Sequence, residues 1–348
     1  MKVMFYTMGM SKGGCERNIT NIANELISKY DITIVTNNNM DSAYKLDKKI
    51  KHIKIDTKKR RIYNKISYHR TKELKKIINI EKPNLIIAML PEASIRVLSL
   101  KKKINIPIIV AIRNHPEYEF KGLKLLRNYY YQKADLILTQ SPVYFKYLPF
   151  KKMDYIPNYI DNSFIDFKKK VKKKNIIVTV SRLAYQKNIS LLIKAFAKLP
   201  FPSYQLHIYG IGQDEQKLRK LIHKLHLEKR VILKGNSNDI ASDISHAKLF
   251  VLTSRYEGMP NALIEALYLG IPAISTNSSE VISDIIDDGK NGFIVSNKND
   301  LINKMIYLLE NSERLNEFSK NTILIRDKFN REDIIDKWYT VIDNYTKK

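Results

Sequence analysis

Two carboxylates, Glu257 and Glu265, stand eight positions apart on either side of a predicted helix start. The segment between them begins with Gly258, Met259, Pro260, Asn261 and Ala262. An apolar run, residues 249–252, predicts a buried strand before this segment, and a proline is favoured in the first turn of the helix that follows. Free N–H groups at a helix start bind anions, and carboxylates accept hydrogen bonds from sugar hydroxyls. The pattern therefore suits a nucleotide sugar, although a plain strand, turn and helix with two solvated glutamates has the same spacing.

Two cations, Arg182 and Lys187, follow another predicted strand, residues 176–181. Ligands of parallel sheets bind at the carboxyl ends of the strands, so both side chains could reach one diphosphate. Arginine binds phosphate through two parallel hydrogen bonds, whereas lysine acts as a point charge. Taken alone, the two residues are also what a very basic chain places on any surface loop.

Glycines mark two further predicted strand ends. Gly13 and Gly14 follow the first strand of the chain, and Gly210 and Gly212 follow the second strand of the carboxy-terminal half. Glycine lets a loop pass close to a ligand, and a helix start after Gly14 would offer N–H groups to phosphate. A tight turn requires the same residues, so the glycines by themselves do not decide between these functions.

The amino-terminal half carries five further candidates. Arg113, Asn114 and His115 follow its fifth predicted strand, and Glu16 stands in the first turn of its first helix. Cys15 is predicted as a small buried residue rather than a catalytic thiol. None of the seven histidines has the spacing of a metal site, so neither a metal nor another cofactor is predicted.

Composition restricts the class of protein. The chain has 348 residues, 44% of them hydrophobic, which allows a substantial core in two domains. The single cysteine excludes an internal disulfide and fits a reducing compartment, so a cytoplasmic location is expected. No apolar run is long enough to span a bilayer, and residues 1–10 lack the features of a signal peptide.

The net charge of +26 lies mainly in the first half. Residues 1–160 hold 31 basic and 13 acidic residues, a net charge of +18, which leaves +8 for residues 161–348. Three explanations compete: nucleic-acid binding, attraction to anionic lipid, and plain enrichment in lysine. No nucleic-acid-binding motif accompanies the charge, so no specific nucleic-acid partner is predicted. Membrane docking would use clusters such as Lys58–Arg61 and Lys101–Lys103.

Short, continuously apolar runs alternate with helical stretches, a pattern typical of α/β proteins with parallel sheets covered on both faces. Strands are predicted at residues 2–6, 32–36, 52–55, 84–88, 108–112, 134–139 and 154–156, with helices at about 15–28, 64–80, 92–102, 120–132 and 141–147. A second series of strands is predicted at residues 176–181, 205–209, 231–233, 249–252, 273–275 and 293–295.

The repeated pattern predicts two doubly wound, Rossmann-like domains. The expected boundaries are 1–160 for an amino-terminal domain, 161–175 for a lysine-rich linker and 176–328 for a carboxy-terminal domain. Residues 329–348 are expected to form a helix that can pack back on the amino-terminal domain. Its predicted apolar face consists of Ile334, Ile335, Trp338, Val341 and Ile342.

Three motifs give the chain a resemblance to a known family. The strings EGMPNALIEA, VSRLAYQKN and GGCER resemble the motifs of glycosyltransferase family 4, whose members are retaining enzymes with the GT-B fold of two Rossmann-like domains facing across a cleft. The chain departs from the family with Cys15 where alanine is common, with Ile112 and His115 around the RN pair, and without glycines at residues 277–279. These departures leave the specificity for the donor open.

The resemblance implies a role for each motif. Arg182 and Lys187 would neutralise the departing nucleotide diphosphate, in place of a metal ion. Glu257 would contact the donor sugar and Glu265 the ribose, while the glycine loops would line the donor site. His115 would approach the donor, and Glu16, Arg113 and Asn114 would lie near the acceptor, so Arg182, Lys187, Glu257 and His115 are the predicted catalytic residues.

The function implied is transfer of a hexose or N-acetylhexosamine from a UDP-sugar, without a metal, to a hydroxyl of a glycan. The expected setting is assembly of a bacterial surface polysaccharide, such as O-antigen or capsule, on a lipid-diphosphate carrier. The enzyme would then lie at the inner face of the cell membrane, held by its basic half. Two alternatives remain: a UDP-sugar epimerase of GT-B architecture, and a non-catalytic basic protein that binds membrane or nucleic acid.

Overall fold

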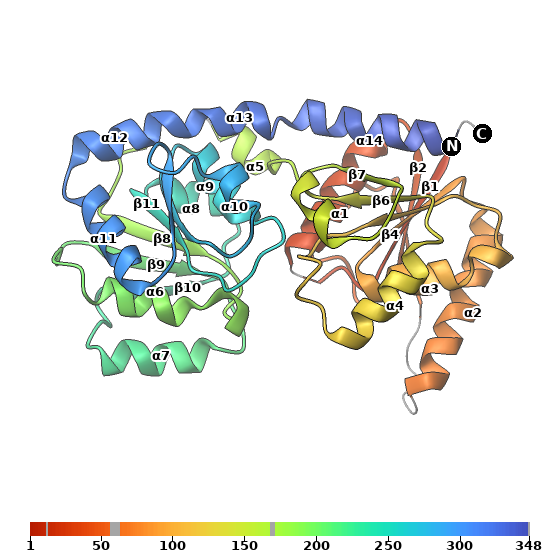
Figure 1. The fold of residues 1–348 in the computed structure, drawn as a ribbon, viewed down its shortest axis with the longest axis horizontal. Coiled ribbons are helices and arrows are strands. Elements are labelled where there is room, and N and C mark those ends of the chain that lie inside the picture. Colours follow the sequence, from red (N-terminus) through yellow and green to blue (C-terminus); the bar gives the residue numbers. More distant parts are fainter. Residues whose placement is uncertain (12, 56–62, 168–170, 347–348) are drawn as a thin grey trace. The chain divides into compact units, whose positions relative to one another are not determined.

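The computed structural model describes residues 1–11, 13–55, 63–167 and 171–346 (Figure 1). The chain forms two compact units, Met1–Asn158 with Arg331–Lys348, and Tyr159–Asn330. The predicted docking cluster Lys58–Arg61 lies outside the described residues.

The first unit contains a parallel sheet of seven strands within the described residues. They are β1 (Lys2–Thr7), β2 (Asp31–Thr36), β3 (Lys51–Lys54), β4 (Leu85–Met89), β5 (Ile108–Ala111), β6 (Leu136–Thr139) and β7 (Met153–Tyr155). The strand order is β3-β2-β1-β4-β5-β6-β7, with every pair parallel. Strands β1 and β4 bury nearly all of their side chains, as expected for a sheet with helices on both faces.

The helical segments of this unit are α1 (Gly14–Leu26), α2 (Tyr63–Glu81), α3 (Pro91–Ser99), η1 (Lys101–Lys103), α4 (Lys121–Tyr131), η2 (Pro142–Tyr147) and α14 (Arg331–Thr346). Two predictions were wrong in detail. The helix expected at 92–102 ends at Ser99 and is followed by a 3₁₀ turn. The segment predicted at 141–147 is a 3₁₀ helix, Pro142–Tyr147, and it ends at Leu148, whose extended backbone is typical of a residue before proline.

The second unit repeats the arrangement with six described strands. They are β8 (Ile176–Val180), β9 (Gln205–Tyr209), β10 (Val231–Gly235), β11 (Leu249–Leu252), β12 (Ala273–Thr276) and β13 (Gly292–Val295). Their order is β10-β9-β8-β11-β12-β13, all parallel. In both sheets the order reverses beside the first strand of the unit, which is the doubly wound topology predicted.

The helical segments of the second unit are α5 (Asn162–Ile165), η3 (Tyr185–Lys187), α6 (Ile189–Phe196), α7 (Glu215–Lys224), α8 (Ile240–Ser245), α9 (Asn261–Tyr268), α10 (Ile282–Ile285), α11 (Lys298–Leu309), α12 (Ser312–Asn321), η4 (Thr322–Leu324) and α13 (Ile325–Lys328). A core of buried aliphatic and aromatic side chains from these helices covers the sheet.

The predicted linker, residues 161–175, is partly folded onto the second unit. Helix α5 is capped by Asp161 and buries Phe164 completely. Lys173 donates to the carbonyl oxygen of Ser245 at the end of α8, where the helix dipole favours a cation. Phe164 and Lys173 therefore anchor the described parts of this segment, and its assignment as a linker stays a prediction.

Helix α14 belongs to the first unit, although it is separated in sequence from the rest of that unit by the whole second unit (Figure 1). It buries the predicted apolar face in full, namely Ile334, Ile335, Trp338, Val341 and Ile342. Its polar side bonds to α1, where Arg331 donates to both carboxylate oxygens of Glu25 at 2.6 and 2.5 Å. The sequence pattern thus predicted correctly which side of this helix is buried.

Candidate functional site

The candidate site of the second unit lies at the edge of its sheet where the strand order reverses. Strands β8 and β11 are neighbours there, and the loops that leave their carboxyl ends are joined by hydrogen bonds. Gln186 Nε2 donates to the carbonyl oxygen of Tyr256 at 2.9 Å, and the Arg255 N–H donates to the carbonyl oxygen of Gln186 at 2.7 Å. This edge is the general ligand position of doubly wound sheets.

These loops place two predicted site residues in direct contact. Lys187 Nζ lies 2.6 Å from Glu257 Oε1, and the side chains are 19% and 6% exposed. Ser254 Oγ donates to the same oxygen at 2.5 Å. Glu257 is therefore held as a nearly buried carboxylate with two donors on one oxygen.

The second oxygen of Glu257, Oε2, receives no hydrogen bond from any described residue. It is available to a hydroxyl group of a ligand. Lys187 also keeps donor capacity, because an ammonium group has three N–H bonds and one of them serves Glu257. A ligand that carries both hydroxyls and negative charge would satisfy both groups.

Arg182 is the other predicted cation on the β8 loop, and it is exposed. It forms no ion pair or side-chain hydrogen bond with the described part of the chain. Because Glu257 already balances the charge of Lys187, Arg182 adds positive charge that no described carboxylate compensates at this sheet edge, and Arg255 on the β11 loop adds more. That arrangement favours an anionic ligand.

Gly210 and Gly212 allow the β9 loop to pack directly on the Arg182 loop. Gly210 has a φ of +127°, and a methyl group there would lie 2.0 Å from the carbonyl oxygen of Ser181. A methyl group at Gly212 would lie 2.2 Å from the carbonyl oxygen of Leu183. The structure thus explains these glycines. Because they have no side chains, the β9 loop can pack against the backbone on both sides of Arg182.

Helix α9 begins at Asn261, so Pro260 lies outside the first turn in which it was predicted. Pro260 is its N-cap rather than a first-turn residue, with ψ of 89°, and Asn261 is the first helical residue. Glu265 is 5% exposed within α9, while Gly258 and Met259 are half-buried in the loop before it. Glu257 and Glu265 therefore lie at the two sides of a helix start, as the spacing predicted.

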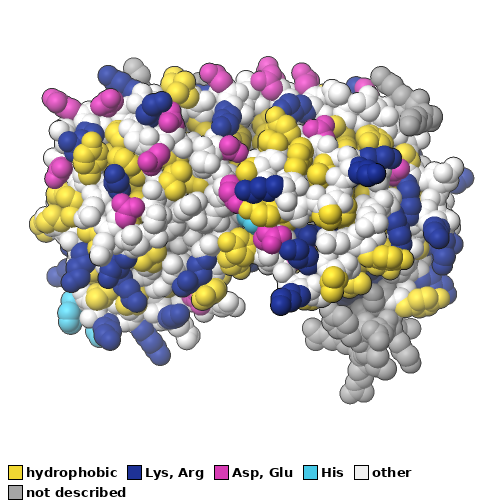
Figure 2. Space-filling model, viewed as in Figure 1, with side chains coloured by type: hydrophobic (Ala, Val, Ile, Leu, Met, Phe, Trp, Pro, Cys, Tyr) yellow, Lys and Arg dark blue, Asp and Glu magenta, His cyan; other side chains and the backbone are white. Residues whose placement is uncertain are grey.

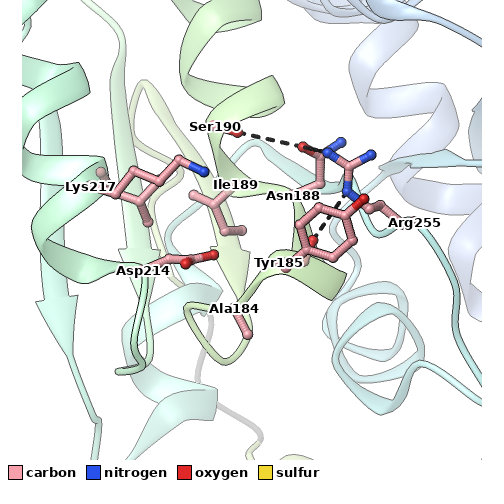
Figure 3. A pocket seen from close by; sticks show the side chains of 9 residues that line it. Ala184, Tyr185, Asn188, Ile189, Ser190, Asp214, Lys217 and Arg255 are labelled. Atoms are coloured by element: carbon pink, nitrogen blue, oxygen red, sulfur yellow. Dashed lines mark hydrogen bonds between the residues drawn. The ribbon is translucent and has the colours of Figure 1, made fainter.

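A small hollow lies beside these loops (Figure 3). Its lining includes Tyr185, Asn188, Asp214 and Lys217, and its volume is about 50 Å³. Arg255 closes one side, with its guanidinium 4.3 Å from the centre of the Tyr185 ring. Ligand pockets usually measure about 300–1,000 Å³, so this hollow is too small for a nucleotide.

In the first unit, the predicted glycine loop precedes α1. A methyl group at Gly13 would lie 2.3 Å from Oε2 of Glu16, so this carboxylate rests against the backbone at the helix start. The Gly13 N–H donates to Tyr44 Oη at 3.2 Å. The Gly13 N–H is thus bonded within the protein, and the expected contact of Gly13 and Gly14 with the donor stays a prediction.

Cys15 follows this loop inside α1. Burial, with a further contribution from the Glu16 charge, raises the pKa of its thiol to about 12. The thiol is therefore protonated at neutral pH and unsuited to act as a nucleophile.

Arg113 and His115 are buried in the first unit, each 6% exposed, whereas Asn114 is exposed. Arg113 Nη1 donates to Asn158 Oδ1 at 3.1 Å, and its guanidinium lies 5.5 Å from the Trp338 ring centre. Burial lowers the pKa of Arg113 to about 10, so it remains charged at neutral pH. Arg113 thereby ties β5 to the segment after β7 and to α14, and its expected contact with an acceptor stays a prediction.

The imidazole of His115 is packed among three tyrosines. The ring centres of Tyr118, Tyr144 and Tyr147 lie 4.7, 5.2 and 5.3 Å away. Nδ1 accepts the Glu117 N–H at 3.1 Å, which leaves the proton of a neutral ring on Nε2. These contacts give His115 an evident structural role, and its predicted catalytic role stays a prediction.

Sequence reasoning missed Ser254, which donates to Glu257, and Gln186, which joins the two loops. The string QK marked Gln186 only as a neighbour of Lys187, and no pattern distinguishes Ser254 from other serines. No group of three or more metal-ligating side chains is found among the residues that the structure describes.

Each of the two units matches a known protein family. The family described as "Glycosyl transferase 4-like" matches residues 16–141, and "Glycosyl transferases group 1" matches residues 161–324. A Campylobacter jejuni protein, GalNAc-alpha-(1->4)-GalNAc-alpha-(1->3)-diNAcBac-PP-undecaprenol alpha-1,4-N-acetyl-D-galactosaminyltransferase, is 26% identical, and the alignment covers 98% of each chain. The amylovoran biosynthesis glycosyltransferase AmsD of Erwinia amylovora is 25% identical over 98% of this chain and 99% of its own.

Among solved structures, Anabaena HepE in complex with UDP-glucose superposes with a TM-score of 0.85. The match covers 99% of this chain and 100% of HepE at 18% identity, so it shows the fold, which is GT-B. The matches support a transferase over the epimerase and the non-catalytic binding protein. The chain therefore belongs to the glycosyltransferases, with a 4-like amino-terminal domain and a group 1 carboxy-terminal domain.

Proposed function

We propose that this glycosyltransferase moves a hexose or N-acetylhexosamine from a UDP-sugar to a hydroxyl of a lipid-linked glycan, with retention of anomeric configuration, in the assembly of a bacterial surface polysaccharide. The observation that carries the proposal is the Lys187–Glu257 ion pair, with Arg182 on the same β8 loop, at the sheet edge where doubly wound domains bind ligands. Cations there suit a diphosphate, and the unoccupied Oε2 of Glu257 suits a sugar hydroxyl.

In this proposal the bond between the anomeric carbon and the phosphate oxygen breaks while the acceptor oxygen attacks from the same face. The acceptor proton passes to the departing phosphate oxygen. Arg182 and Lys187 stabilise the charge that develops on the diphosphate, and Glu257 orients the sugar. Catalysis then consists mainly of charge stabilisation and of positioning two substrates.

The names of the relatives support the proposed donor and acceptor. HepE was solved with UDP-glucose, and the C. jejuni enzyme is named for a glycan on diphospho-undecaprenol. A lipid-linked acceptor requires the enzyme to work at the inner face of a membrane, and the +18 charge of residues 1–160 favours an anionic surface. None of the helices in the described residues has both the length and the apolar character needed to cross a bilayer.

The proposal is tested by hydrolysis of a panel of nucleotide sugars, since a water molecule can take the place of the acceptor hydroxyl. We expect hydrolysis of a UDP-hexose or UDP-N-acetylhexosamine and the same anomer in the first-formed product as in the donor. Hydrolysis of GDP- or ADP-sugars alone would refute the UDP assignment, and an inverted anomer would refute retention.

We also expect activity in the presence of excess EDTA. Arg182 and Lys187 provide the positive charge that a divalent cation supplies in other transferases, so removal of free metal should leave the rate within about twofold, far below the tenfold that corresponds to 1.4 kcal/mol. Rates with and without EDTA, and with added magnesium or manganese, measure this. Complete loss in EDTA with recovery on addition of metal would contradict the assigned role of the two cations.

A further inference from the structure

Helix α4 presents several large apolar side chains to solvent. Leu125 is 72% exposed, Leu126 51% and Tyr129 62%. In a surface helix of a soluble protein, such residues normally face the core, because each buried leucine contributes about 1.5–3 kcal/mol. The orientation of α4 is the reverse of that pattern.

The buried side of α4 explains why the helix cannot turn over. Arg127 is fully buried, and its guanidinium donates to Glu119 Oε2 at 2.9 Å and to the carbonyl oxygen of Pro116 at 2.9 Å. Tyr131, one turn later, is 2% exposed. Rotating the leucines inward would break this buried ion pair, so the fold itself holds the apolar side outward.

The segment before α4 extends the same surface. Tyr118 is 55% exposed and Phe120, the N-cap of α4, is 70% exposed. A methyl group at Gly122 would lie 3.3 Å from the Phe120 ring, so the ring rests on the first turn of the helix. We call Tyr118, Phe120, Leu125, Leu126 and Tyr129 the α4 patch.

Basic residues border the α4 patch on the same helical face. Lys121, Leu125, Tyr129 and Lys133 follow one another at four-residue steps, and the Lys133 ammonium lies 4.4 Å from the Tyr129 ring centre. Helix α4 contains no acidic residue. The two acidic residues of the preceding loop are both paired, Glu117 with Lys124 and Glu119 with Arg127.

The positive charge continues beyond the end of α4. Lys101 forms an ion pair with Asp135, just after α4, which brings η1 to this end of the patch. Lys102 and Lys103 are exposed there. In the view of Figure 2, hydrophobic and basic side chains lie next to one another over α4.

We infer that the α4 patch is the surface by which the first unit docks on an anionic bilayer. Exposed leucine and aromatic side chains bordered by lysines are typical of helices that lie in the plane of a membrane interface. This inference rests on the membrane location in the proposed function and identifies the element that inserts. The predicted cluster Lys101–Lys103 then contributes charge at the edge of the patch and is not the insertion element.

The test is co-sedimentation of the full chain with vesicles of phosphatidylcholine alone or mixed with phosphatidylglycerol. We expect binding only to the mixed vesicles. L125Q/L126Q should lower the partition coefficient at least about tenfold at any salt concentration. K121Q/K133Q should lower it about fivefold or more per lysine at low salt, with a smaller effect at high salt, because exposed charges are screened. The control I323Q/L324Q removes two equally exposed apolar residues of the second unit and should bind as the parent does.

Hydrolysis of the nucleotide sugar separates the two proposals. We expect L125Q/L126Q to keep the parental rate, because the patch is not part of the donor site. The inference is overturned if L125Q/L126Q binds vesicles as the parent does, or if its loss only equals that of I323Q/L324Q. It is also overturned if the parent is a dimer in solution and L125Q/L126Q separates the two copies without any effect on vesicle binding, because the patch would then be an interface between copies. A parent that binds vesicles through the α4 patch yet hydrolyses no nucleotide sugar would overturn the proposed function and leave the docking surface in place.

Discussion

Replacing Arg182 by alanine is expected to lower kcat about 100- to 1,000-fold while leaving the melting temperature unchanged. The reason for the kinetic effect is loss of the cation on the β8 loop that is assigned to the diphosphate and has no described carboxylate partner, since removing a single donor to a developing oxyanion costs that much in other enzymes. Stability should not change, because Arg182 is exposed and bonds to no described side chain. Steady-state kinetics together with thermal melts measure both quantities.

The matched control is Lys194→Ala, which removes an exposed cation at the end of α6 in the same unit. It lowers the net charge by the same amount, so any general electrostatic effect on donor encounter appears in both variants. Near-parental turnover of Arg182→Ala, or an equal loss in Lys194→Ala, would remove the diphosphate contact from Arg182.

Lys187→Ala should show the same kinetic loss together with a loss of stability. Without Lys187, the nearly buried Glu257 carboxylate keeps only the hydrogen bond from Ser254, which costs about 1–3 kcal/mol of unfolding free energy. The double variant Lys187→Ala/Glu257→Gln should recover that stability but not turnover. Replacing Lys187 thus lowers both turnover and stability, whereas replacing Arg182 lowers turnover alone, because only Lys187 forms an ion pair within the described part of the chain.

The second large effect is expected from the two glutamates, which should separate catalysis from binding. Glu257→Gln should lower turnover by at least about tenfold, because an amide replaces the carboxylate that orients the sugar hydroxyl. It should not weaken the affinity for free UDP, because Lys187 is then released from its ion pair and remains available to the diphosphate. Glu265→Gln should mainly weaken UDP binding, because this residue is assigned to the ribose.

Calorimetry with free UDP and kinetics with the active donor measure the two effects on the same preparations. Glu310→Gln, at the end of α11, serves as a control for the loss of one carboxylate elsewhere in the same unit. Equal losses of UDP affinity in Glu257→Gln and Glu265→Gln would refute the division of roles.

The sequence by itself determined the elements and much of the site. Continuous apolar runs such as residues 249–252 predicted buried parallel strands, because only a sheet covered on both faces buries every side chain of a strand. The spacing in α14 predicted its buried face for a similar reason, since side chains three and four positions apart share one side of a helix. Residue type and spacing also singled out Lys187 and Glu257.

Their contact, however, was decided by the tertiary structure. Lys187 and Glu257 are 70 positions apart, and only the adjacency of β8 and β11 brings their loops together. The same holds for Gly212, whose missing side chain matters because another loop's carbonyl oxygen lies 2.2 Å from where it would be. Local patterns carry no information about such neighbours.

The clearest difference concerns α4 and the residues next to it. The string KGLKLLRNYYY predicted a helix correctly, but Leu125 and Leu126 are exposed and Arg127 is buried. The buried ion pair between Arg127 and Glu119 decides that orientation, and it joins the helix to the loop before it. Amphipathic spacing shows that a helix has two faces, whereas the partners supplied by the folded chain determine which of them meets the core.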